Sequence, residues 1–92
     1  MKIPMVHELK IDKRFFNVIL SGKKKCEIRR ADRKFHIHDT LFLRETKYTG
    51  QEMRLLGKPL IYTGREVRRH ITHIVHTPCI GMMSGFVVLS IE

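Results

Sequence analysis

Hydrophobic and polar residues alternate at residues 6–11 and again after Gly22, which is the period of two expected for strands. The alternation is interrupted near the start, where apolar residues recur at helical spacing, and again in the middle, where glycine and proline accumulate. We therefore expect several short strands and one early helix. Strands are predicted at residues 6–11, after Gly22, at 40–46, at 61–75 with a break at Gly64, and at 85–92, with a loop and turn at 31–39.

The predicted helix follows the first strand directly and covers residues 12–21. Asp12 is well placed to cap its first turn. Ser21-Gly22 ends it, because glycine adopts a left-handed C-terminal cap without steric cost. One face of this helix repeats apolar residues at i, i+3 and i+4 and is expected to be buried. That stripe consists of Phe16, Ile19 and Leu20.

The strand after Gly22 combines an apolar face with a strongly charged one. Cys26 and Ile28 share one face, and Lys25, Glu27 and Arg29 share the other. We expect the apolar pair to point into the core and the charged residues to point outward. From this pattern alone, the charged face would be an exposed ladder of ion pairs, each of which stabilises the fold by about 0 to 1 kcal/mol.

The length and the element order favour a single α+β domain over residues 1–92. At 92 residues the core must be small. Strands too short and too few to fill two sheets usually close on themselves, so a small mixed β-barrel of about five strands is expected. Residues 47–60 have weak periodicity and contain Gly50, Gly57 and Pro59, which predicts a loop insertion.

Positive charge is concentrated in the first third of the chain. The formal net charge is +9, and residues 1–34 hold eleven Lys and Arg against four acidic residues. A field this uneven favours a polyanionic partner, because neutralised phosphates release condensed counterions. The alternative is a surface that serves solubility alone.

Cysteine content and hydropathy indicate a reduced, cytoplasmic protein with no membrane partner. Two cysteines are too few for a disulfide framework, and no secretory hydrophobic segment follows Met1. The longest aliphatic or aromatic run, Phe86 to Leu89, is far shorter than the roughly 18 residues that span a bilayer.

The basic segment also carries a motif. Gly22, Lys24, Glu27 and Arg29 fit the pattern G-x-K-x-x-E-x-R, which resembles the signature of the ASCH domain, a branch of the PUA-like superfamily. The resemblance covers nearly the whole chain and is closest to a short branch from bacteria and phages. Its flanks include His7 to Lys10, Asp39, Tyr62 to Glu66, and Gly85 to Ile91.

This resemblance implies a small β-barrel with the motif lining a cleft, and a role in binding nucleic acid. Lys24 and Glu27 are placed in the cleft by resemblance only, because alternation sends Lys24 to the opposite side. Lysine and arginine would grip phosphate, and Glu27 would accept a hydrogen bond from an exocyclic amine of a base. Unpaired RNA suits such a cleft better than duplex DNA. The expected binding residues are Lys10, Lys23, Lys24, Lys25, Glu27, Arg29, Arg30 and Tyr62.

Two other functions stay open. A small relative in the same superfamily, N4-acetylcytidine amidohydrolase, hydrolyses a modified nucleoside, and Lys24 falls on its catalytic lysine. Glu27 stands where that enzyme has a threonine nucleophile, so only Lys24 and Glu27 would serve as catalytic residues, as a proton-transfer pair. We expect binding rather than catalysis. The third alternative is a protein-interaction module.

Histidines and a cysteine recur at a spacing of three late in the chain, at His70, His73, His76 and Cys79. On a helix these residues would converge as zinc ligands. The segment is rich in β-branched residues, however, and on a strand this spacing sends successive side chains to opposite faces. His36 and His38 lack an evident third ligand. We therefore expect no metal and no cofactor.

Overall fold

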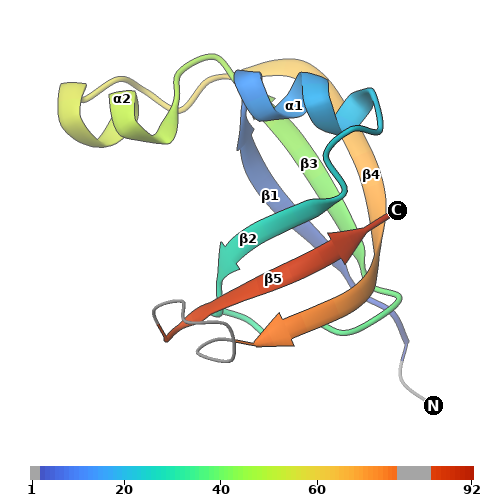
Figure 1. Cartoon of the computed structure of the whole chain (residues 1–92). Coiled ribbons are helices and arrows are strands. Elements are labelled where there is room, and N and C mark those ends of the chain that lie inside the picture. The colour runs from blue at the N-terminus through green and yellow to red at the C-terminus, as the bar shows by residue number, and fades with distance from the viewer. Residues whose placement is uncertain (1–2, 77–83) are drawn as a thin grey trace.

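The computed structural model describes residues 3–76 and 84–92, and within them the chain forms five strands and two helices (Figure 1). The expected α+β class, the five strands and the helix after the first strand are confirmed. The elements are β1 (Val6–Asp12), α1 (Lys13–Leu20), β2 (Cys26–Arg30), β3 (Thr40–Thr46), α2 (Gly50–Leu56), β4 (Tyr62–His76) and β5 (Phe86–Ile91).

The five strands form one mixed sheet that curls on itself. Its order is β1-β3-β4-β5-β2, with β1 and β3 parallel and the other neighbours antiparallel. The long strand β4 pairs with β3 through its first half and with β5 through its second, and its register with β5 shifts between Ile71 and His73. β4 thus joins the two halves as one continuous strand. The break expected at Gly64 is a local irregularity, where the pairing with β3 shifts register between Arg44 and Thr46 and Gly64 has φ of +92°. β1 and β2 remain as the two edges, so the sheet is not closed.

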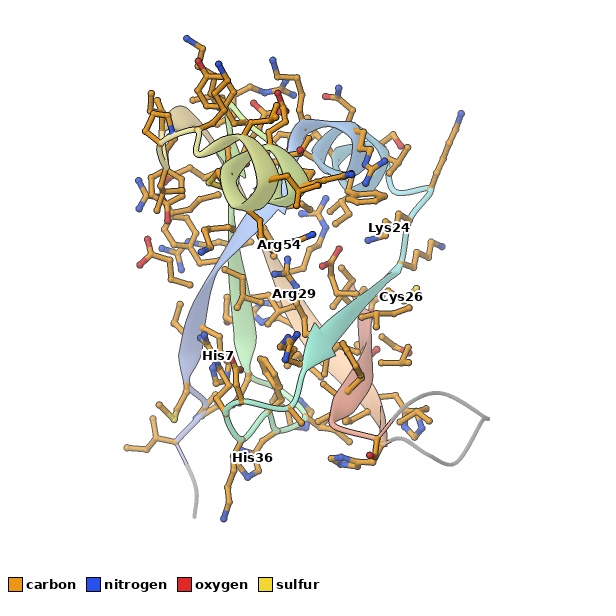
Figure 2. The ribbon with its side chains drawn as sticks, turned by 90° about the vertical axis from the view of Figure 1, so that its left-hand side faces the viewer. His7, Lys24, Cys26, Arg29, His36 and Arg54 are labelled. Atoms are coloured by element: carbon orange, nitrogen blue, oxygen red, sulfur yellow. The ribbon has the colours of Figure 1, made fainter. Side chains whose placement is uncertain are left out.

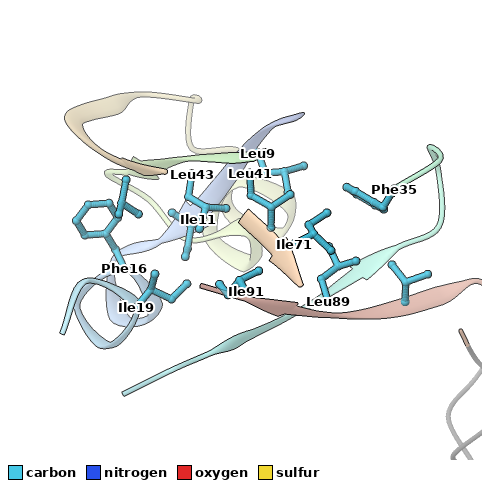
Figure 3. Packing of buried hydrophobic residues seen from close by; sticks show 12 residues of the cluster. Leu9, Ile11, Phe16, Ile19, Phe35, Leu41, Leu43, Ile71, Leu89 and Ile91 are labelled. Carbon is cyan, nitrogen blue, oxygen red and sulfur yellow. The ribbon is translucent and has the colours of Figure 1, made fainter. Parts of the chain in front are cut away.

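The core fills the inside of the curl. α1 lies across one end and inserts Phe16 and Ile19, while Phe35 approaches from the other end (Figure 3). Leu20, the third member of the expected helical stripe, is instead 52% exposed. The remaining core residues come from the strands and are Leu9, Ile11, Leu41, Leu43, Val67, Ile71, Val87, Leu89 and Ile91.

The inward face of β2 is the opposite of the one expected. Cys26 and Ile28 are exposed, and Glu27 is buried with 4% of its surface accessible. The pairing with β5 explains the orientation: Glu27 lies opposite Leu89, whose side chain is fully buried, so both point into the curl. The prediction that the charged face points outward is therefore wrong for this strand.

The segment 47–60 is not only a loop, because it contains α2. Thr49 caps this helix by accepting from the backbone N–H of Glu52, and the Glu52 carboxylate accepts from the N–H of Thr49 in return. Gly57 ends the helix in a left-handed conformation. α2 stands beside the curled sheet (Figure 1) and is tied to it where Gly50 N–H donates to Asp12 Oδ1 at 3.2 Å. Asp12 occupies the N-cap position of α1, as expected, but its side chain makes no capping bond there.

Candidate nucleic-acid interface

The two edges of the sheet face each other across a seam. β1 and β2 share no backbone hydrogen bonds in the described structure; instead, Arg29 Nη2 reaches across and donates to the Lys10 carbonyl at 2.7 Å. Beside this bridge lies a hollow of about 360 Å³, which we call the seam hollow. It is lined by β1, α1 and the motif segment, including Lys10, Asp12, Phe15, Lys24, Glu27 and Arg29.

Three residues of the motif meet in the seam hollow. Lys24 Nζ lies 2.5 Å from Glu27 Oε1, and Arg29 Nε lies 3.0 Å from Glu27 Oε2. The carboxylate is almost fully buried, whereas the two cations keep about a quarter of their side-chain surface exposed, 27% and 23% respectively. A carboxylate offers about four acceptor positions, so one side chain can hold both cations and still accept from a ligand.

The local backbone explains how Lys24 joins Glu27 despite the alternation argument. Gly22 adopts a left-handed conformation with φ of +82°, and the N–H groups of Lys23 and Lys24 then donate to the Val18 carbonyl at the end of α1. Lys24 therefore lies in a turn before β2 begins, and the period of two does not apply to it. Figure 2 shows Lys24 and Arg29 directed toward the gap between β1 and β2, with Cys26 on the other side of the strand.

An aromatic side chain that the sequence reasoning did not single out completes the hollow. Phe15 on α1 is 38% exposed, and the Lys24 ammonium lies 4.9 Å from the centre of its ring. The ring is the aromatic part of a lining that otherwise consists of charged residues and of Ile11, Cys26 and Ile28. A signal for it existed: Phe15 is an apolar residue off the buried stripe of its own helix.

Comparison with known proteins assigns the chain to a family. Residues 6–91 match the family described as a domain of unknown function, DUF3850. The chain belongs to this family. It is also 35% identical over 69 residues to a protein of Escherichia phage P2, described as an uncharacterized 12.9 kDa protein in the GpA 3' region. The alignment covers 75% of this chain and 53% of the phage protein, so the chain spans about half the length of that relative.

The other expected binding residues are distributed around the seam. Lys25 lines a neighbouring hollow of about 470 Å³ between α1, β4 and β5, which we call the helix-end hollow. Arg30 lines one of about 270 Å³ beside residues 32–35, which we call the loop hollow. Lys23 is exposed and lines none of these three hollows. Tyr62 lies elsewhere, with the Arg44 guanidinium 3.7 Å from the centre of its ring.

The histidines do not form a metal cluster within the described residues. Between residues 3–76 and 84–92, no three His, Cys, Asp or Glu side chains are arranged to hold a metal ion. Cys79, the last member of the expected pattern, lies outside the described residues. His70 Nδ1 is instead 3.1 Å from the Thr40 hydroxyl across the β3 and β4 pair. None of the helices in the described part of the chain is long and apolar enough to cross a membrane.

A second buried carboxylate lies at the opposite end of the curl. Asp39 is 1% exposed; its Oδ2 lies 2.8 Å from His7 Nε2 and accepts from His36 N–H, and its Oδ1 accepts from Met5 N–H. Burial raises the pKa of this carboxyl, but the hydrogen bonds from His7, Met5 and His36 outweigh it, and the pKa is lower than usual. This group ties β1 to the turn before β3, and it has a structural rather than a ligand-binding geometry.

Proposed function

We propose that this chain is a nucleic-acid-binding domain that takes an unpaired RNA nucleotide into the seam hollow. The observation that carries the proposal is the buried Glu27 carboxylate, which holds two partly exposed cations, Lys24 and Arg29, beside the exposed ring of Phe15. Charge of both signs next to an aromatic face matches the parts of a nucleotide. The volume of the seam hollow, about 360 Å³, is near the lower end of the range for small-ligand sites.

Each group has a distinct task in this proposal. Lys24 and Arg29 still have free donors and bind the phosphate, since charge-assisted hydrogen bonds are the strongest available at a partly exposed site. Glu27 accepts from an exocyclic amine on the base edge. Phe15 supplies a stacking surface for the base, a contact worth about 1 to 3 kcal/mol per base in other proteins. A paired base cannot enter such a hollow, which favours single strands over duplexes.

We further propose that the curled sheet is an open form of the PUA-like barrel and that the motif makes the chain an ASCH-type domain. The open seam between β1 and β2, bridged by Arg29, supports this view because it leaves Lys24 and Arg29 partly exposed at the place where a closed barrel would pair its edges. The match of Gly22, Lys24, Glu27 and Arg29 to the motif supports it as well.

The direct test is binding to a single-stranded RNA hexamer, duplex RNA and duplex DNA between 50 and 200 mM salt, measured by fluorescence anisotropy. We expect the hexamer to bind most tightly. Lys24→Gln keeps a donor for Glu27 but removes the charge, and it should weaken hexamer binding about 5-fold to 10-fold and flatten the salt slope by about 0.7. Lys58→Gln removes one positive charge after α2 and should leave hexamer binding and its salt slope unchanged. Equal losses in the two variants would contradict the proposed site.

One observation favours a second candidate, hydrolysis of a modified nucleoside. The Lys24 ammonium and the Glu27 carboxylate are 2.5 Å apart in a hollow, as a proton-transfer pair would be. Incubation with N4-acetylcytidine, followed by chromatography, separates the two candidates. We expect no turnover; steady deacetylation that is lost in Lys24→Gln would favour the enzyme.

A further inference from the structure

The motif segment lines three hollows in series, not one. Lys24 lines both the helix-end hollow and the seam hollow, and Lys10 and Arg29 line both the seam hollow and the loop hollow. Residues shared between neighbouring hollows show that they adjoin. Their order follows the chain: residues 24 and 25, then 24–29, then 29–33.

We propose that residues 24–33 form a track for at least three consecutive nucleotides of a single strand, with one nucleotide at each hollow. This inference rests on the proposed function, because it takes the seam hollow as the central position. β2 alone extends for about 17 Å at the usual rise of about 3.3 Å per residue. That length exceeds what a single nucleotide in the seam hollow would use.

Cations extend along the whole track. Lys24, Lys25 and Arg69 line the helix-end hollow, and Arg29, Arg30 and Arg33 line the loop hollow. Neither Lys10 nor Lys25 forms an ion pair with a described residue, so both keep their charge available. The two acidic residues of the loop hollow are paired: Glu8 with Arg44 at 2.7 Å, and Asp32 with Arg33 at 3.4 Å. Glu92 lines the helix-end hollow as its acidic member.

The helix-end hollow accepts a phosphate only if the negative end of α1 is compensated. The structure provides this compensation. The Ile19 carbonyl accepts from Gly22 N–H and from Arg69 Nη2, and the Val18 carbonyl accepts from Lys23 and Lys24 N–H. With these carbonyls occupied, Lys25 and Arg69 set the sign of the local field. The hydroxyls of Thr72 and Ser90 line the same hollow and supply further donors.

The test is a length series of oligocytidylates with one, two, three, four and six nucleotides and a 5' phosphate. The longer members are measured by anisotropy and the mononucleotide by NMR titration to millimolar concentration. Affinity should rise with each nucleotide up to at least three, and the salt slope should steepen by about 0.7 per added phosphate contact. Lys25→Ala and Arg33→Ala should each weaken hexamer binding several-fold and leave mononucleotide binding unchanged. Lys58→Ala is the matched control.

The outcomes separate this inference from the proposal beneath it. Affinity that stops rising at one nucleotide, or hexamer binding that is normal in both Lys25→Ala and Arg33→Ala, would overturn the track but leave the seam hollow as a nucleotide site. If no length binds, both proposals fall. A competition experiment with a poly-glutamate peptide completes the test. If the peptide displaces the RNA hexamer at an equal concentration of negative charges, the surface binds polyanions in general, which would contradict the track.

Discussion

Replacing Glu27 with alanine is expected to lower the free energy of unfolding by about 2 to 4 kcal/mol. Removing one partner of a buried ion pair usually costs about 3 to 5 kcal/mol, because the remaining charge is left uncompensated. The expected loss is somewhat smaller here, since Lys24 and Arg29 keep about a quarter of their side-chain surface in water. Urea unfolding followed by circular dichroism at pH 7 measures it.

Two further variants decide what the carboxylate is for. Glu27→Gln keeps the shape and one acceptor and should cost about half as much as alanine. A triple change of Lys24→Met, Glu27→Leu and Arg29→Met removes all three charges together. It should be at least as stable as Glu27→Ala, because well-packed apolar residues often replace a buried ion group without loss.

The triple variant should also lose RNA binding, in which case the three charges serve the ligand and not the stability of the fold. If the free energy of unfolding of Glu27→Ala is within about 0.5 kcal/mol of that of the unchanged protein, Lys24 and Arg29 are hydrated independently and Glu27 does not organise the hollow. Retained RNA binding in a folded triple variant would contradict the proposed function itself.

The strands were predictable because their periods and turn residues agree with the final fold. β3 and β5 lie where strands were predicted, and Gly22 ends α1 as expected. The inward face of β2 was not predictable in the same way. Alternation defines two faces but does not say which one is buried, and Cys26 and Ile28 are more apolar than Glu27. The pairing of Glu27 with Leu89, 62 positions away, decides the matter.

The second helix was missed although its signal is local. Thr49 and Glu52 form a capping box, but the nearby glycines and proline favoured a loop. The seam itself has no local signal. Lys10 and Arg29 are 19 residues apart, and they meet because the curl of the sheet brings its two edges together. Resemblance to a family motif brought Lys24 and Glu27 together in the prediction, where periodicity alone would have separated them.

Replacing Asp39 is expected to destabilise the fold about as strongly as the loss of Glu27. Asp39 accepts from the backbone N–H groups of Met5 and His36 and pairs with the buried ring of His7. Asp39→Ala leaves these groups without their partner, at a cost of about 3 kcal/mol or more. Asp32→Ala is the matched control: Asp32 is an exposed aspartate with a single long ion pair to Arg33, and its change should stay within about 0.5 kcal/mol.

The pH dependence of unfolding tests the same carboxylate in a way that a packing defect does not reproduce. The pKa of Asp39 is below its ordinary value of 3.8 in the folded protein, although burial alone would raise it, because its hydrogen bonds favour the charged form. The stabilisation from this group is therefore fully present above the unfolded pKa and is lost as the pH falls through the folded pKa. Urea unfolding at pH 2 to 7 should show this loss below about pH 4 in the unchanged protein. In Asp39→Asn the curve should be lower at pH 7 and flatter below about pH 4, since the amide does not titrate. An equally steep acid limb in Asp39→Asn would assign the acid sensitivity to other carboxylates.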